Sequence, residues 1–167
     1  MLQQGALWIG LLILAGCSHY KLGTGAPRSF STLYIPPVVA RALLPQAAAL
    51  VSTQVREAFL RDGRVTVVNS ADAADATLQI DLERYDRETA VARSDDTGLA
   101  RKLDVRLYAS CTLLDLRSRQ TLFTRRPVVA TRGVFADSGQ LQAEYQALPL
   151  LAQDLSGQIV HAVLDTW

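Results

Sequence analysis

The segment Leu103-Asp104-Val105-Arg106-Leu107-Tyr108-Ala109-Ser110-Cys111-Thr112-Leu113 alternates apolar and polar side chains without a break. Successive side chains of a β-strand point to opposite faces of a sheet, so a period of two predicts a strand with one dry face and one wet face. Cys111 falls on the dry face, where we expect it to act as a small core residue. A sheet built on this strand should bury one face and leave the other in water.

The segments on either side of residues 103–113 are also predicted to be strands. Leu78, Ile80 and Leu82 alternate with polar residues in the same way. Residues 87–99 are polar and predict a loop or a flared hairpin tip. Residues 115–119 are expected to form a turn, and residues 120–132 a further strand.

The amino-terminal part of the domain predicts a strand, a helix and a second strand. Residues 32–35 form a short β-rich run that ends at Pro36 and Pro37. Pro45 is suited to the first position of a helix, and Gly63 is suited to the left-handed residue that follows one. Residues 65–68 then return as a strand. Such a unit normally places its two strands parallel with a right-handed crossover.

A second helix is expected at the carboxyl end, where an apolar stripe at helical spacing runs from Tyr145 to Val163. Ser138 is a candidate cap, and Pro149 should kink the helix or mark a second start. Together these elements predict an α/β (α+β) two-layer sandwich, in which two amphipathic helices pack on one face of a mixed four- to five-stranded sheet.

Composition excludes several classes of function. The 167 residues carry 17 Lys and Arg against 16 Asp and Glu, a balance that argues against a nucleic-acid-binding protein. The two cysteines and two histidines show no metal-ligand spacing, and no nucleophile elbow, phosphate loop or zinc-protease motif occurs. We therefore predict a protein that is not an enzyme and that uses no cofactor and no metal.

The first residues predict that the protein is targeted to a membrane. The apolar run of residues 6–14 has the length of a signal-peptide core and is shorter than the ~20 residues that cross a bilayer. Leu14-Ala15-Gly16-Cys17 follows, and it resembles a bacterial lipobox, in which the cysteine thiol accepts a diacylglycerol. We predict a lipoprotein signal peptide over residues 1–16, a lipidated Cys17 with a tether over residues 17–31, and a single periplasmic α/β domain over residues 32–167. An uncleaved membrane anchor is the alternative.

Five arginines fall within sixteen residues that contain no Asp, Glu or Lys: Arg117, Arg119, Arg125, Arg126 and Arg132. Arginine pairs bidentately with phosphate and carboxylate groups, so one interpretation of the cluster is a site for an anionic ligand. The alternative is an edge strand whose charges prevent aggregation. The sequence leaves both interpretations open.

Several short motifs in order resemble one family. Tyr20-Lys21-Leu22 follows the lipobox, and the other motifs are Tyr34-Ile35-Pro36-Pro37, Arg61-Asp62-Gly63, Ala74-Asp75-Ala76-Thr77-Leu78 and Gln153-Asp154-Leu155. The chain is similar in these respects to the lipopolysaccharide-assembly lipoproteins of the LptE family. That resemblance implies an outer-membrane lipoprotein on the periplasmic side, which plugs the LptD-like β-barrel that inserts lipopolysaccharide, helps that barrel to fold, and binds lipopolysaccharide.

The resemblance gives the wet sheet face and the basic side chains specific roles. Large outer-membrane barrels have polar lumens, so Lys102, Arg106, Tyr108 and Thr112 are candidates for contacting the barrel wall; the alternative is a face that is merely solvated. Candidates for the lipopolysaccharide phosphates are Arg93, Arg125 and Arg126. Two other functions remain open: a lipid-anchored binding module of another envelope complex, and an envelope hydrolase that would use a carboxylate such as Asp81.

Overall fold

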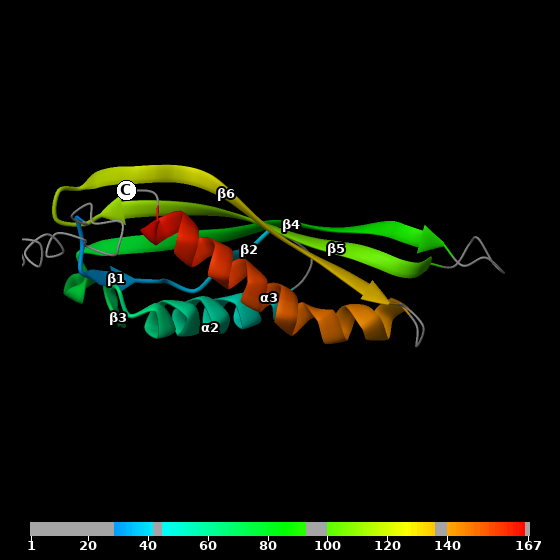
Figure 1. Cartoon of the computed structure of the whole chain (residues 1–167). Helices are drawn as coiled ribbons and strands as arrows, with labels where there is room; N and C mark the ends of the chain where they lie inside the picture. Colours follow the sequence, from blue (N-terminus) through cyan, green and yellow to red (C-terminus); the bar gives the residue numbers. More distant parts are fainter. Residues whose placement is uncertain (1–28, 42–44, 93–99, 136–139, 166–167) are drawn as a thin grey trace, which may run out of the picture.

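The computed structural model describes residues 29–41, 45–92, 100–135 and 140–165 as two helices packed on one side of a sheet (Figure 1). The strands are β1 (Thr32–Tyr34), β2 (Val39–Ala40), β3 (Thr66–Val68), β4 (Ala76–Ala92), β5 (Ala100–Asp115) and β6 (Gln120–Phe135). The helices are α2 (Pro45–Asp62) and α3 (Gln140–Leu164), with a short 3-10 turn, η2 (Ala71–Ala73), before β4. The two-layer α+β architecture predicted from the sequence is confirmed.

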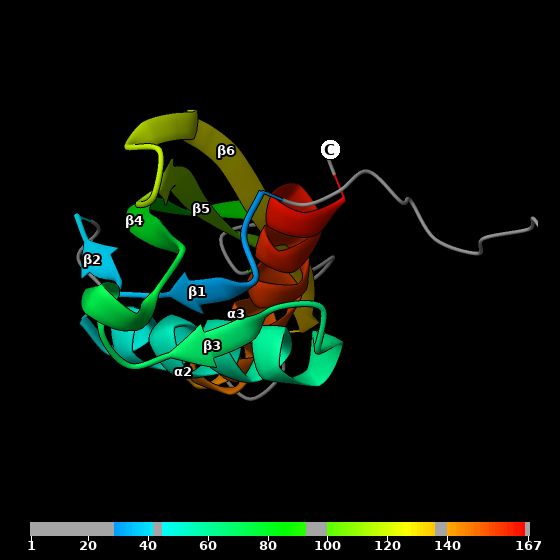
Figure 2. The same cartoon turned by 90° about the vertical axis from the view of Figure 1, so that its left-hand side faces the viewer.

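The sheet is mixed, with the strand order β3-β1-β4-β5-β6. The strand β1 is parallel to both β3 and β4, whereas β4, β5 and β6 are successively antiparallel. Viewed from its end, the sheet curls so that β1 and β3 lie beside α2, while β6 lies over α3 (Figure 2). The parallel pairing expected of the two strands that flank the first helix is confirmed.

The sheet has six strands rather than four or five because one edge segment is broken in two. Both β1 and β2 pair with β4, at Leu33 with Ala76 and at Val39 with Asp81. Pro36 and Pro37 stand between the two short strands. Since proline cannot donate a ladder hydrogen bond, the pairing along this side of β4 is interrupted there.

The strand β4 is longer than the sequence predicted. Residues 87–99 were expected to form a loop or a flared hairpin tip, and residues 87–92 continue the strand, with Arg87 and Thr89 paired with Val105 and Leu103 of β5. Arg87 and Glu88 are exposed, so their charges do not have to be buried. The hairpin alternative therefore agrees with the structure here, and the loop alternative is wrong for residues 87–92, because polar residues can continue a strand when their side chains stay exposed. Residues 93–99 lie outside the described part of the chain.

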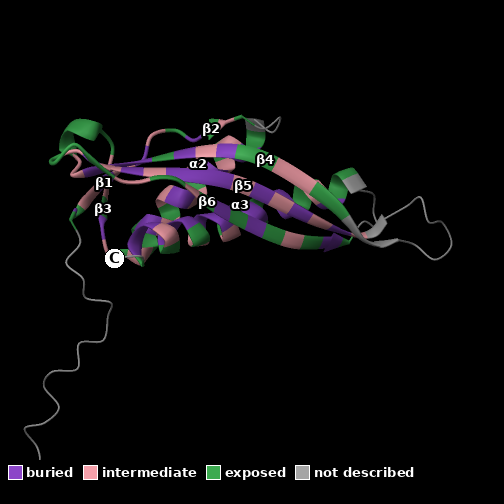
Figure 3. Ribbon diagram, turned by 90° about the horizontal axis from the view of Figure 1, so that it is seen from above, coloured by how far each residue is buried: buried purple, intermediate pink, exposed green. Residues whose placement is uncertain are grey.

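The core lies between the sheet and the helices. The apolar side chains of β5 that were expected on the dry face, Leu103, Val105, Leu107, Ala109, Cys111 and Leu113, are all buried. Figure 3 shows these buried positions of β5 alternating with partly buried ones. Cys111 is fully buried, and this burial raises the pKa of its thiol to about 12. Cys111 is thus the small core residue that the alternation predicted.

The helix α2 begins and ends at the residues that the sequence indicated. Pro45 is its first residue, and Gly63 follows its last with φ of +71°, a conformation that costs glycine little. The Gly63 amide donates to the carbonyl of Phe59 at 3.1 Å, which closes the last turn. Val51, Val55 and Phe59 form the buried stripe of this helix.

The helix α3 runs without interruption through Pro149. Proline removes the amide that would bond the carbonyl of Tyr145, four residues earlier. Both Pro149 and Tyr145 are exposed, so that carbonyl can be hydrated, while Leu148 and Leu151 remain buried on the other side. The expected second start does not occur. The candidate cap Ser138 lies outside the described residues.

The point at which the chain enters the sheet is fixed by Asp75. One oxygen of its carboxylate accepts from the Ser31 amide at 2.8 Å, from the Ser31 hydroxyl at 2.8 Å and from the Thr32 amide at 3.0 Å. These hydrogen bonds, those from Ser31 foremost, hold the pKa of Asp75 far below its usual range. Arg117, in the turn between β5 and β6, lies 3.5 Å from the other oxygen. The start of the domain and this turn therefore lie at the same end of the molecule.

Candidate functional site

The face of β4 and β5 that is turned away from the helices, called here the open face, is polar. Lys102, Arg106, Tyr108 and Thr112, predicted to share one face, do so in alternation with the buried row of β5. Arg84, Asp86 and Glu88 of β4 stand opposite Tyr108, Arg106 and Asp104. The candidate partner-binding residues thus form one continuous surface with charged residues of β4.

The charges on the open face are paired. Arg106 lies 2.9 Å from Glu88, Arg84 lies 2.9 Å from Asp86, and Lys102 lies 4.0 Å from Asp104. The guanidinium of Arg84 also lies 4.2 Å from the centre of the Tyr108 ring. Exposed pairs of this kind contribute little to stability. These pairs give the open face many hydrogen-bonding groups, and their three cations are balanced by three anions. Such a face suits a polar partner surface better than a strongly charged one.

A bulge in β4 is what brings the β4 charges to this face. Leu82 pairs with Ala109 and Arg84 pairs with Tyr108, so Glu83 is an extra residue that has no partner on β5. An extra residue reverses the alternation beyond it. As a result Arg84 faces away from the helices, and Tyr85 faces α3, where burial and the nearby Glu144 raise its pKa to about 12. The adjacent charged residues Glu83 and Arg84 are the sequence signal for this shift.

A second bulge, in β6, positions Arg125. Thr124 and Arg125 together stand opposite Thr112, and Arg125 has a φ of +47°, which is uncommon for a residue other than glycine. The Arg125 amide donates to the Thr112 hydroxyl at 3.1 Å. Its guanidinium donates to the Glu83 carboxylate at 2.7 Å. The Arg125–Glu83 pair therefore joins the two bulges across β5.

Arg126 lies on the opposite side of the sheet from Arg125. It stands opposite the buried Cys111, its guanidinium is 3.9 Å from the centre of the Phe123 ring, and it donates to the carbonyl of Ala162 near the end of α3. A cation at the carboxyl end of a helix is favoured by the helix dipole. The two candidate lipopolysaccharide residues in β6 are thus separated by the sheet. Arg93, the third, and Cys17, the predicted lipidation site, lie outside the described residues.

The five arginines that are close in sequence do not form one patch. Besides Arg117 at Asp75, Arg132 lies on the helix side and donates two hydrogen bonds to the Asp154 carboxylate, at 2.5 and 2.9 Å. The strand β6 lies at the edge of the sheet. Its position agrees with the protective interpretation of the arginines, and a role in ligand binding stays a prediction for Arg125 and Arg126.

The described residues contain no group of three or more His, Cys, Asp or Glu side chains that could hold a metal ion. Asp81, the carboxylate considered for hydrolysis, lies 3.4 Å from Arg41, and the nearby Glu83 lies 2.7 Å from Arg125. His161 is exposed on α3 and contacts Asp165, which directly follows that helix. Each of these side chains has a structural partner.

Comparison with known proteins adds the following. A model of the LptE family, described as lipopolysaccharide-assembly, matches residues 30–163. A comparison with curated proteins found no match. A solved protein from Xanthomonas campestris is 17% identical, with 89% of this chain and 91% of that chain covered and a TM-score of 0.61. Uncharacterized lipoprotein B from Nitrosomonas europaea is 21% identical, with 87% of each chain covered and a TM-score of 0.54. A PelC dodecamer from Paraburkholderia phytofirmans is 14% identical, with 84% of this chain and 93% of that chain covered and a TM-score of 0.50. At these identities the structures share the fold.

Neither helix in the described part of the chain combines the length and the apolar character that crossing a membrane requires.

The backbone of the β6 bulge can be tested apart from the Arg125 side chain. Arg125→Gly and Arg125→Val both remove the ion pair with Glu83, but only glycine adopts a φ of +47° without strain, and valine is particularly unsuited to it. We expect the valine variant to be less stable than the glycine variant by about 1–2 kcal/mol in urea unfolding. Equal stabilities would mean that the bulge does not constrain β6.

Proposed function

This chain belongs to the LptE lipopolysaccharide-assembly family, and on that premise we propose that it is an outer-membrane lipoprotein that plugs the LptD-like, lipopolysaccharide-inserting β-barrel. In this role it assists assembly of the barrel and delivery of lipopolysaccharide to the outer leaflet. The family is not enzymatic, and its members act in lipopolysaccharide assembly.

The observation that carries the proposal is the contrast between the two faces of the sheet. The helices cover one face, and the open face presents paired charges, Tyr108 and Thr112 to its surroundings. A barrel lumen is lined by polar side chains that need hydrogen-bond partners when water is displaced. A neutral, polar face can exchange hydrogen bonds with such a wall without leaving a buried charge unpaired.

The anchor is proposed to be the lipid on Cys17. Phe30 and Ser31 begin the described domain at the end that holds the 116–119 turn, so the tether joins the domain at that end. Several acyl chains on one cysteine give stable attachment, at ~0.8 kcal/mol for each buried methylene. This arrangement leaves the open face unobstructed by the attachment point.

Lipopolysaccharide is proposed to meet basic side chains through its phosphates, with Arg125, Arg126 and Arg93 as candidates. The Arg125 side chain is 62% exposed, and Glu83 holds it over the open face. Arg126 lies on the helix side, where it donates to the carbonyl of Ala162. Charge-assisted contacts with phosphate would favour binding at either position.

A lipid-anchored binding module of another envelope complex is the alternative. The likeness to PelC, which forms a dodecamer, shows that this fold occurs in other assemblies. In-cell cross-linking followed by identification of the attached protein separates the two functions, because only the proposed one yields the lipopolysaccharide-inserting barrel.

The contact with the barrel is tested with variants of the open face. We expect the double variant Arg106→Ala/Tyr108→Ala to reduce the amount of barrel that co-purifies by about tenfold or more. We also expect depletion of the protein to lower the amount of folded barrel in the cell. Thr53→Ala/Glu57→Ala, at two exposed positions of α2, is the matched control. Normal barrel levels after depletion would contradict the proposal, provided that immunoblots confirm the loss of the protein.

The anchor is tested by Cys17→Ala, which removes the only thiol in the predicted lipobox. We expect this variant to leave the outer-membrane fraction and become extractable by an alkaline wash. Cys111→Ala, which changes the buried cysteine, should stay attached. Equal retention of both variants in the outer membrane would show that Cys17 does not anchor the chain.

Lipopolysaccharide binding is tested by Arg125→Gly, which removes the cation and keeps a residue suited to the positive φ. Arg119→Gly is the matched control, because Arg119 also has a positive φ, of 57°, and lies in the neighbouring turn. We expect Arg125→Gly alone to weaken binding about tenfold or more, and added salt to weaken binding by the unmodified protein. If the two variants bind equally, Arg125 is not part of the site.

A further inference from the structure

The outer edge of β6 has no strand beside it in the described part of the chain. β6 pairs with β5 on one side only, and it is the last strand of the sheet. An edge strand directs the amide and carbonyl of every second residue outward, where they can pair with another chain. Whether such an edge is protected depends on the residues along it.

Protection of the β6 edge is confined to its first half. Arg125, with its positive φ, and Pro127 interrupt regular pairing there. From residue 128 to residue 135 the strand is regular, and it pairs continuously with residues 102–109 of β5. The single charge in this stretch, Arg132, is turned toward α3 by its bonds with Asp154. Eight residues of the edge therefore lack the usual devices that prevent strand addition.

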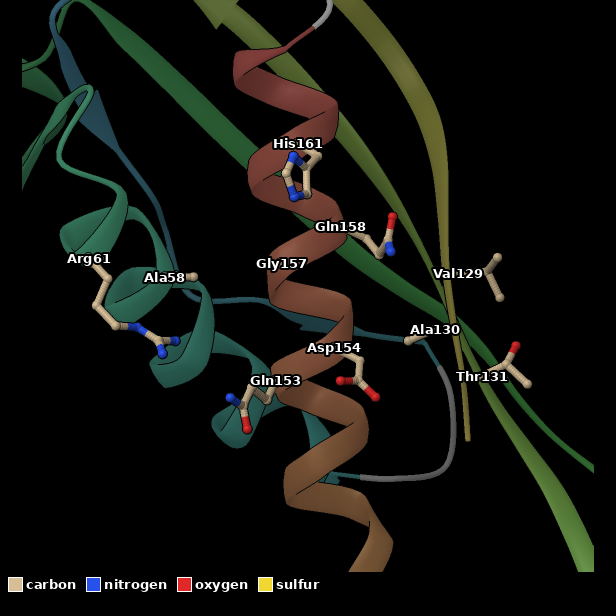
Figure 4. A pocket seen from close by; sticks show the side chains of 10 residues that line it. All are labelled: Ala58, Arg61, Val129, Ala130, Thr131, Gln153, Asp154, Gly157, Gln158 and His161. Atoms are coloured by element: carbon tan, nitrogen blue, oxygen red, sulfur yellow. The ribbon is translucent and has the colours of Figure 1, made fainter. Parts of the chain in front are cut away.

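The helix α3 leaves room beside this edge. A cavity of about 520 Å³ extends over the outer side of α3 and is bounded by residues of α2 and β6 (Figure 4). On the β6 side its lining includes Val129, Ala130 and Thr131, and on α3 it includes Gly157 and Gln158. A strand added to β6 would lie about 4.8 Å from it, over this part of α3.

Gly157 lies on α3 in the lining of this cavity. Glycine inside a helix is destabilising relative to alanine. A Cβ built at residue 157 would meet no heavy atom within 4 Å, so contacts within the described structure do not require glycine there. Because residue 157 has no side chain, nothing projects from the outer side of α3 at the place where a neighbouring backbone would pass.

The position of the β6 edge indicates the source of the added strand. Val129 stands opposite Tyr108, and Phe135 stands opposite Lys102, so the edge directly continues the open face. Val129 and Phe135 are 47% and 64% exposed and offer an added strand apolar contacts there. The charges of β6 do not select an occupant, because Arg125 is paired with Glu83 and Arg132 with Asp154. The partner proposed for the open face is therefore the one that also reaches this edge.

We propose that residues 128–135 of β6 accept an added β-strand, which passes over Gly157 and comes from an extended segment of the barrel protein with apolar side chains that contact Val129 and Phe135. This inference rests on the proposed function, because that function supplies the partner. Strands in the wall of a closed barrel use both edges for pairing. The segment must therefore lie outside the barrel wall, in a loop or an extension of the barrel chain. Main-chain hydrogen bonds would hold it, and the small hollow at Gly157 would select for a small residue there.

The experiment is amide hydrogen exchange on the full chain, alone and in its co-purified complex with the barrel. We expect about half of the amides in residues 128–135 to exchange at least tenfold more slowly in the complex. If the complex forms and these amides exchange as in the free chain, strand addition is wrong and the proposed function stands. If no complex forms, the proposed function fails and this inference fails with it. Protection in the free chain together with sedimentation as a dimer would overturn the inference in favour of self-pairing.

A pair of α3 variants tests the path over Gly157. Gly157→Leu fills open space, so the free variant should melt at or above the temperature of the unmodified protein. In cells it should reduce barrel co-purification at least tenfold and remove the exchange protection. Gln142→Leu adds the same side chain at an exposed position of α3 outside the cavity and should change neither. Undiminished co-purification and protection with Gly157→Leu would overturn the proposed path.

Discussion

The apolar row of β5 can be covered from one side only, and the rest of the structure depends on how the two helices do this. Leu103, Val105, Leu107 and the residues that continue their row are removed from water by packing under the helices. Because side chains alternate, the same strand must send its polar row to the other side. One long strand therefore fixes both the core and the position of the open face.

The two bulges let the neighbouring strands serve both faces. Regular alternation beyond Leu82 would turn Arg84, Asp86 and Glu88 toward α3, where burial of their charges would be costly. The extra residue Glu83 sends them to the open face and gives α3 the less polar Tyr85 instead. In β6 the extra residue opposite Thr112 decides which arginine faces which side, so that Arg125 lies on the open face and Arg126 on the helix side. The Arg125–Glu83 pair then links these two irregular positions.

The sequence predicted those features that local periodicity and chain-breaking residues determine. Leu78, Ile80 and Leu82 indicated β4, Pro45 and Gly63 marked the ends of α2, and Cys111 was placed in the core. Features that depend on pairing between distant residues could not be predicted in this way. The extension of β4 past Arg87 depends on its partner strand, and the placement of Arg125 on the open face with Arg126 on the helix side depends on a bulge opposite Thr112. The continuity of α3 at Pro149 depends on that residue being exposed. Of the candidate site, the shared face of Lys102, Arg106, Tyr108 and Thr112 was predictable because it needs only alternation.

The open face and the open edge make different demands on a partner. On the open face each charge already has an opposite charge beside it. A partner can therefore only exchange existing hydrogen bonds for new ones, and each exchange contributes little binding free energy. This favours a large and geometrically matched partner surface over a small ligand. Along β6 the main-chain groups repeat at a fixed spacing, and an extended backbone is the structure that satisfies them. A chain that enters a polar lumen meets both conditions when the wall faces β4 and β5 and a separate segment reaches β6. In these two proposals, recognition is divided between side chains that match a surface and a backbone that pairs with a strand.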